Sequence, residues 1–122
     1  MKDMQPEVYD KAADRILDRG WVQGHGVLDG KFCMGAAVQQ EASIVHGQEQ
    51  DPWNDAYAVV EPYFIFLTKC LYPEQPTYSG IGAHYIICWN DHQGRTQGEV
   101  VEALLNAGKA LREQQQADVR ED

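Results

Sequence analysis

The chain has 122 residues, and its 19 acidic and 10 basic side chains give it a formal net charge of −9. This length suits one domain with its own hydrophobic core. The negative charge repels nucleic acid phosphates, which argues against a nucleic-acid-binding protein. No apolar run reaches the roughly 18 residues of a membrane span, so no membrane association is expected.

The cysteines and the N-terminus indicate the compartment. The three cysteines do not show the spacing of a disulfide framework, and this suits a reducing environment. The first residues lack the apolar stretch of a signal peptide. We therefore expect a cytoplasmic protein, located in the host cytoplasm if a phage encodes it.

The N-terminal third predicts a helix followed by a β-hairpin. Residues 6–19 place apolar side chains at helical spacing, and Gly20 suits a left-handed C-cap. Asp29 and Gly30 then stand between two apolar stretches. Because both central positions of a tight hairpin turn favour a positive φ, this pair predicts the hairpin.

Two further helices are predicted in the middle of the chain. Small and apolar residues over 33–45 favour a second helix. Asp51 and Pro52 suit the N-cap and the first position of a third helix. Pro62 is predicted to break or kink that helix, because proline lacks the N–H that a helix interior needs. The apolar run over 62–72 restarts it as a buried segment.

The last third predicts a strand and a capped helix. The run "AHYIICW", residues 83–89, is short, apolar and β-branched, which favours a buried strand over a turn of helix. Thr96 and Glu99 have the spacing of a capping box. The helix that they begin is predicted to end near Arg112.

These elements define the expected fold class and domain organisation. We expect an α+β fold, a small and predominantly helical single domain with a β-hairpin and one further short strand. The globular domain spans residues 1–112. Residues 113–122 have no apolar stripe and are predicted to form a disordered polar tail.

A polar segment, "WNDHQGRT" over residues 89–96, follows the predicted strand. Its residue types fit a strand-to-helix turn without any ligand. Trp89 would anchor the strand in the core, Asn90 or Asp91 would form an Asx-turn, and Thr96 would cap the helix. Arg95 could pair with Asp91 or reach another loop carbonyl. This structural interpretation is favoured over a chemical site.

Three short motifs, "GWVQG", "CMGA" and "WNDHQGRT", occur in this order along the chain. With them, the chain resembles an uncharacterised domain family of actinobacteria and their phages, over most of residues 7–111. The matching positions are Gly20, Trp21, Gln23, Gly24, Cys33, Gly35, Ala36, Trp89, Asn90, Asp91, Arg95, Thr96, Glu99, Val100 and Leu104. Residues 46–80 depart from the family by being longer and rich in aromatics. The resemblance implies a bacterial or phage origin but no activity.

A cysteine nucleophile is one candidate chemistry. Cys33 stands where a helix N-terminus is predicted, and that position lowers the pKa of a thiol. His84 could act as its base, and Asn90 or Asp91 could orient the imidazole, in the chain order of papain-like enzymes. However, the residues on either side of Cys33 are apolar, which is more typical of a small core residue.

Metal and nucleotide sites are weaker candidates. His84 and Cys88 have the short spacing of zinc ligands, but on a buried strand they would be core neighbours. Gly24 and Gly26 lack the third glycine and the helix of a phosphate-binding loop. No metal site and no cofactor are therefore predicted.

The aromatic residues favour a binding function. They cluster over residues 52–72 and 76–89 in a number beyond the needs of one small core, so either some form an exposed interface or all of them form an aromatic core. We expect a non-enzymatic module that binds a protein partner or associates with itself as a homodimer. The alternative is a cysteine-dependent hydrolase or transferase that uses Cys33, His84 and Asn90 or Asp91. The predicted binding residues are Trp21, Gln23, Trp89, Asn90, Asp91 and Arg95.

Overall fold

Five helices and one two-stranded hairpin form the parts of the chain that this computed structural model describes, residues 4–47, 56–74 and 82–120. The elements are α1 (Glu7–Arg19), β1 (Val27–Leu28), β2 (Lys31–Phe32), α2 (Met34–Val45), α3 (Ala56–Leu71), α4 (Gly82–Asp91) and α5 (Gln97–Arg120). The predicted small, predominantly helical α+β fold is confirmed. Among these described helices, none combines the length and the apolar character needed to cross a membrane.

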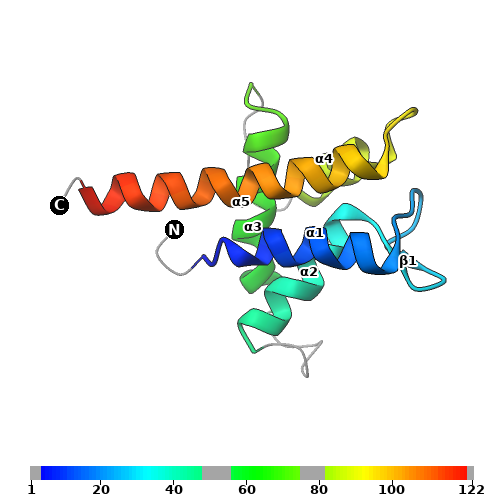
Figure 1. The fold of residues 1–122 in the computed structure, drawn as a ribbon, viewed down its shortest axis with the longest axis horizontal. Helices are drawn as coiled ribbons and strands as arrows, with labels where there is room; N and C mark the ends of the chain where they lie inside the picture. The colour runs from blue at the N-terminus through cyan, green and yellow to red at the C-terminus, as the bar shows by residue number, and fades with distance from the viewer. Residues whose placement is uncertain (1–3, 48–55, 75–81, 121–122) are drawn as a thin grey trace.

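The helices pack around one hydrophobic core. Figure 1 shows α1 and α5 lying side by side and antiparallel, with α3 crossing them. The shorter helices complete the arrangement, since α2 packs against both α1 and α3, and α4 packs against α2 and α3. Each helix contributes at least one fully buried side chain, for example Ile16, Val38, Leu67, Ile86 and Leu104.

The predicted hairpin is present and has the expected turn. Asp29 and Gly30 have φ values of 53° and 79°, and Val27 pairs with Phe32 across the antiparallel ladder. Both central residues therefore have the positive φ of the tight hairpin turn. The further β pairing within the described residues is an isolated parallel bridge between Trp21 and Phe32, not a third strand.

Of the break or kink predicted at Pro62, the break does not occur, because α3 continues from Ala56 to Leu71 with Pro62 inside it, and the kink stays a prediction. Pro62 itself lies at an exposed position of the helix. The following Tyr63 is buried and holds the helix in the core. The predicted N-cap at Asp51 and Pro52 lies outside the described residues.

The prediction of a strand over residues 83–89 is wrong, because this segment lies within helix α4. The buried positions are Gly82, Ile86 and Asn90, four residues apart, as expected for one face of a helix. In a strand, His84 and Cys88 would share the face of Ile86, yet both are exposed. A short apolar run does not distinguish a buried strand from a buried helix, and here helix packing decides.

The last helix continues past Arg112 through residues 113–120, where the polar composition predicted a disordered tail. Arg112 forms an ion pair with Asp10 of α1. One turn further, Gln115 Nε2 donates a hydrogen bond of 2.7 Å to the Met4 carbonyl. These contacts, together with the good helix formers in this stretch, extend the helix beyond its last apolar core residue.

The predicted capping box of α5 is confirmed. Glu99 N donates to Thr96 Oγ1 at 3.2 Å, and Thr96 N donates to Glu99 Oε1 at 3.0 Å. The hydrogen bonds from Thr96 lower the pKa of the Glu99 carboxyl. The carboxylate therefore stabilises the fold above its ordinary pKa, and this contribution is lost as the pH falls through the lowered value.

We expect Thr96→Ala to lower the free energy of unfolding by about 1 kcal/mol, because an N-terminal backbone N–H of α5 loses its acceptor. Urea denaturation monitored by circular dichroism measures this change. Thr96→Ser keeps the hydroxyl and is the matched control. Equal stability of the Ala and Ser variants would contradict a role of the hydroxyl in capping α5.

Candidate functional site

The side chain of Asn90, at the end of α4, joins three parts of the chain. Its Oδ1 accepts hydrogen bonds from Trp21 Nε1 at 2.7 Å and from the Met34 N–H at 2.9 Å. Its Nδ2 donates to the Val22 carbonyl at 3.1 Å and to Asp91 Oδ1 at 2.9 Å. Asn90 is only 1% exposed. All four hydrogen-bonding positions of the amide are therefore used inside the protein.

The loop after α1 is held against the end of α4 by a second group of bonds. Gln23 Nε2 donates to the carbonyls of Asn90 and His92, both at 3.0 Å. Gly24 N donates to Asp91 Oδ1 at 2.9 Å. The loop "GWVQG" and the segment "WND" are thus parts of one structural unit.

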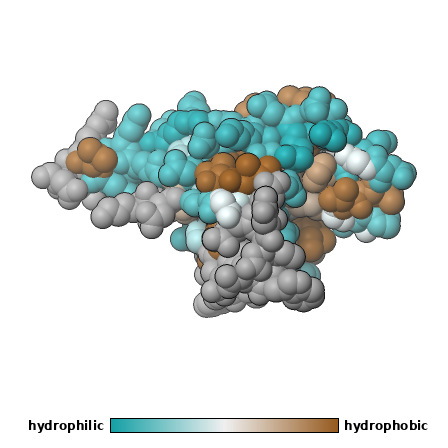
Figure 2. All heavy atoms as spheres, turned by 90° about the horizontal axis from the view of Figure 1, so that it is seen from below, coloured by the Kyte–Doolittle hydropathy of each residue, from teal (hydrophilic) through white to brown (hydrophobic). Residues whose placement is uncertain are grey.

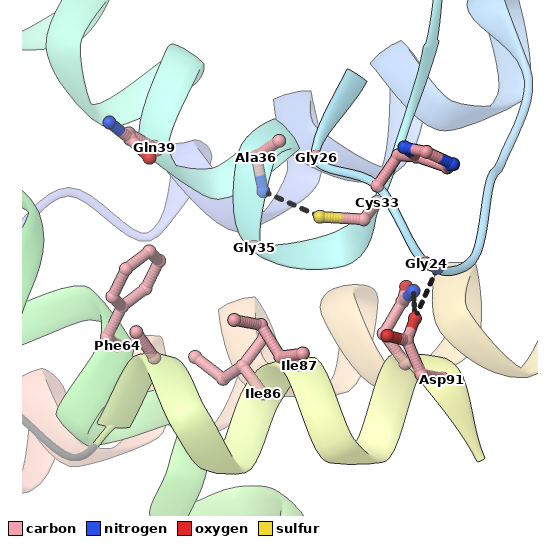
Figure 3. Close-up of a pocket in the computed structure, with 13 residues that line it drawn as sticks. Gly24, Gly26, Cys33, Gly35, Ala36, Gln39, Phe64, Ile86, Ile87 and Asp91 are labelled. Carbon is pink, nitrogen blue, oxygen red and sulfur yellow. Dashed lines mark hydrogen bonds between the residues drawn. The ribbon is translucent and has the colours of Figure 1, made fainter. Parts of the chain in front are cut away.

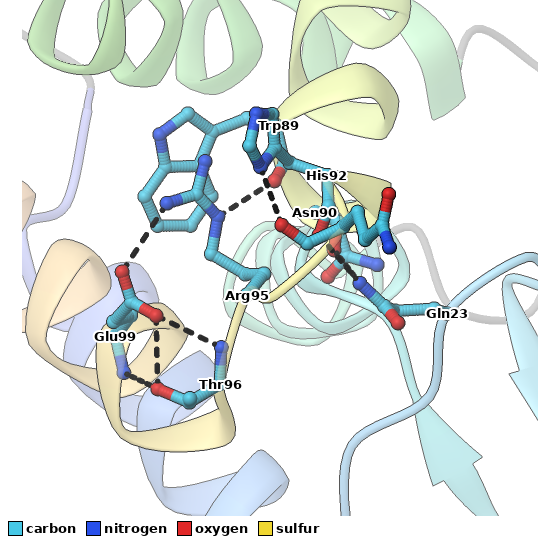
Figure 4. Close-up of polar contacts among 8 residues, drawn as sticks. Gln23, Trp89, Asn90, His92, Arg95, Thr96 and Glu99 are labelled. Atoms are coloured by element: carbon cyan, nitrogen blue, oxygen red, sulfur yellow. Dashed lines mark hydrogen bonds and ion pairs between the residues drawn. The ribbon is translucent and has the colours of Figure 1, made fainter.

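On the other side of the α4 end, Arg95 covers Trp89 (Figure 4). The guanidinium carbon lies 3.6 Å from the centroid of the Trp89 ring, and Nε donates to the Trp89 carbonyl at 2.8 Å. Of the two predicted roles of Arg95, the structure shows contact with a backbone carbonyl, and the ion pair of Arg95 is with Glu99 at 3.3 Å, not with Asp91. This arrangement combines a cation–π contact with a cap on the carbonyl end of α4.

The structure thus brings all six predicted binding residues to one end of α4. Their interactions are largely with one another and with backbone groups. Within the described residues, no buried side-chain nitrogen or oxygen lacks a hydrogen-bond partner. The predicted strand-to-helix turn is not found, because the segment ends a helix and the side chains of Asn90 and Asp91 bond to residues far away in the sequence. Any role of the six residues in binding stays a prediction.

A pocket of about 280 Å³ lies next to this unit, between α4 and the start of α2 (Figure 3). Most of its wall is apolar, and a few polar side chains lie among the lining residues. The lining residues are Gly24, His25, Gly26, Cys33, Gly35, Ala36, Gln39, Phe64, Ala83, Ile86, Ile87, Asn90 and Asp91. It is the candidate functional site, because it is a concave surface beside the motifs that the sequence emphasised.

Cys33 lies in this pocket at the N-cap of α2, where the sequence predicted a helix N-terminus. Its Sγ accepts a hydrogen bond of 3.3 Å from the Ala36 N–H, and the residue is 8% exposed. Burial raises the pKa of the Cys33 thiol, and Asp91 raises it further, while the N–H groups of Ala36 and Gly35 lower it. The net effect is a raised pKa, which favours the thiol over the reactive thiolate.

His84, the proposed base for Cys33, is exposed on α4 and is not among the described residues that line the pocket. Its Nε2 lies 3.7 Å from Cys88 Sγ, one turn away on the same helix. The histidine that lines the pocket with Cys33 is His25. His84 lies away from the pocket because α4 is a helix, and the helical repeat turns His84 to its outer face.

Sequence reasoning missed His25, Gln39 and the apolar wall of Ile86 and Ile87. The wall could be found only after α4 is recognised as a helix. His25, between two glycines, carried a signal as a polar residue in a glycine-rich loop. Across the described part of the chain, no three His, Cys, Asp or Glu side chains come together as a metal site.

Comparison with protein-family models shows the family of this chain. Residues 1–110 match the model of a family described as "Family of unknown function (DUF6197)". No curated protein and no solved structure matches the chain. Since the match covers most of the sequence, the chain belongs to DUF6197, a family of unknown function.

Proposed function

We propose that this protein is a non-enzymatic binding module, and that the pocket between α2 and α4 takes up an apolar side chain of a protein partner. The observation that supports this most is the apolar wall of the pocket, which Phe64, Ala83, Ile86 and Ile87 form beside polar groups that are engaged internally. Such a surface favours apolar contact over the positioning of a reacting group.

The size of the pocket suits a side chain. Its volume of about 280 Å³ is just below the range of about 300–1,000 Å³ typical of small-molecule sites. Ile87, at its edge, is 52% exposed. A partner that covers this side chain removes apolar surface from water, which stabilises the complex.

The charge of the module indicates the chemistry of the partner. The net charge of −9 attracts a basic surface, and the exposed Asp91 places a carboxylate in the lining of the pocket. We therefore infer a partner segment in which an apolar residue stands next to Lys or Arg. Electrostatic attraction of this kind speeds association and selects against acidic partners.

The hairpin, at one end of the molecule, adds further exposed apolar surface next to the pocket. Val27 and Leu28 of β1 are exposed, and Gly26, the residue before them, lines the pocket. Figure 2 shows hydrophobic surface at this end. Because exposed apolar surface often marks an interface, the hairpin is a natural continuation of the docking surface. We place this activity in the cytoplasm, since the three cysteines are free thiols.

Site-specific photo-cross-linking in cells of the source organism tests this proposal. A photoreactive amino acid at position 87 should give a discrete adduct, whose cross-linked partner residue is apolar with Lys or Arg nearby. The matched control is position 105 on α5, since Leu105 is 45% exposed but does not line the pocket. The same adducts from both positions, or none from position 87, would overturn the proposal.

A cysteine-dependent hydrolase or transferase is the second candidate, because Cys33, His25 and Asp91 line the same pocket. This combination provides the residue types of a nucleophile, a base and an orienting carboxylate. The raised pKa of Cys33 argues against it, since the nucleophile must be a thiolate. The two candidates differ in the reactivity that they predict for Cys33.

For the binding module, we expect Cys33 to react slowly with iodoacetamide at neutral pH and the exposed Cys88 to react first. Because the pKa of Cys33 is raised, its rate should still increase at a pH where an ordinary thiol has reached its plateau. Peptide mass spectrometry measures each rate, with His25→Ala as the comparison. Fast alkylation of Cys33 that depends on His25 would favour the enzyme instead.

A further inference from the structure

The outer face of α4 carries a pair of metal-ligating side chains away from the pocket. His84 and Cys88 are both exposed, and His84 Nε2 lies 3.7 Å from Cys88 Sγ. The two residues are four apart, so one helical turn places them on the same face. Neither residue lines the pocket between α2 and α4.

The distance between His84 Nε2 and Cys88 Sγ fits two ligands of one zinc ion. Zinc binds a histidine nitrogen at about 2.0–2.1 Å and a thiolate sulfur at about 2.3 Å, and a tetrahedral angle then separates the two atoms by about 3.5 Å. The observed distance is 3.7 Å, so only a small side-chain movement is needed. The helix thus holds a nearly preformed two-ligand site.

The described chain offers no third ligand, because no group of three His, Cys, Asp or Glu side chains that could hold a metal occurs among its residues. Structural zinc sites have four protein ligands. We propose that His84 and Cys88 form a half-site for zinc, and that the same pair from a second copy of this chain completes a tetrahedral site with two cysteines and two histidines.

Protons and charge are accounted for when zinc binds at this site. Each Cys88 thiol loses its proton to the solvent and binds the ion as thiolate, and each His84 binds as neutral imidazole through Nε2. Two thiolates neutralise the charge of the zinc ion. Since each chain carries a net charge of −9, two copies repel one another, so their association depends on the metal.

The test uses the full chain, kept reduced by a phosphine so that no Cys88 disulfide forms. Zinc ions alone should double the mass measured by light scattering, with one zinc bound per two chains, and a chelator should restore the monomer. Cobalt in place of zinc should give the visible absorption bands of a tetrahedral site with thiolate ligands.

Single-residue variants identify the ligands. Cys88→Ser and His84→Ala should each abolish the doubling of mass and the cobalt spectrum, and their exposed positions let the fold survive, as circular dichroism checks. Cys70→Ser, which changes another exposed cysteine on α3, should leave both unchanged. The proposal is overturned if the zinc-loaded chain stays monomeric, if zinc binds one per chain, or if Cys88→Ser still dimerises. It does not rest on the proposed partner, which position 87 tests separately.

Discussion

Asn90→Asp is expected to lower the free energy of unfolding by about 3–5 kcal/mol at neutral pH, a large part of the stability of a domain of this size. The change replaces the Nδ2 donor by an oxygen of nearly the same shape. That oxygen faces the Val22 carbonyl and Asp91 Oδ1, which lie 3.1 Å and 2.9 Å from the present nitrogen. Two hydrogen bonds become contacts between acceptors, in a site that is 1% exposed.

The effect of Asn90→Asp should depend on pH in a defined direction. Burial and the nearby Asp91 raise the pKa of the introduced carboxyl above its value in the unfolded chain. A raised pKa in the folded state means that the protonated carboxyl favours folding. The decrease in the free energy of unfolding is therefore smallest in acid and grows as the pH rises through the raised pKa. The protonated carboxyl also regains one donor.

The matched control is Asp91→Asn. An amide oxygen at the position of Asp91 Oδ1 still accepts from Gly24 N and Asn90 Nδ2, so we expect a loss below about 1 kcal/mol. Urea denaturation across a range of pH measures both variants. Similar losses for the two variants at neutral pH would show that Asn90 is not the centre of the network.

Local signals in the sequence predicted much of the fold. The turn at Asp29 and Gly30 and the capping box at Thr96 and Glu99 depend on backbone conformation and on hydrogen bonds between near neighbours. Such features can be predicted from a few consecutive residues, because the residue types allow few alternatives there. Gly20 ends α1 with a positive φ of 103°, but its ψ of 164° lies outside the left-handed helical region that was predicted for this cap.

The errors arise where tertiary contacts decide. The segment over 83–89 contains two isoleucines that favour a strand, yet its burial against α2 and α3 selects a helix. Pro62 would end an isolated helix, but the packing of its neighbours keeps α3 continuous. The stretch after Arg112 lacks an apolar stripe, so the contacts of Arg112 with Asp10 and of Gln115 with Met4 could not be foreseen from periodicity.

The candidate site was predicted in part for the same reason. The motifs "GWVQG" and "WND" were both singled out, and the structure joins them through Trp21 and Asn90, 69 residues apart. Their joint role is to hold α1, α2 and α4 together, which no local pattern indicates. The pocket beside them depends on which face of α4 turns inward. Because this segment was predicted as a strand, His84 was wrongly expected beside Cys33.

Ile86→Ala is expected to lower the free energy of unfolding by about 2–4 kcal/mol, whereas Ile87→Ala should cost less than about 1 kcal/mol. Ile86 is fully buried in the core, and Ile87 is 52% exposed at the edge of the pocket. The same deletion at adjacent positions removes the same atoms, so the difference reports which face of α4 turns inward. Urea denaturation monitored by circular dichroism measures both variants. Equal losses, or a larger loss for Ile87→Ala, would contradict the orientation of α4 and with it the placement of the pocket.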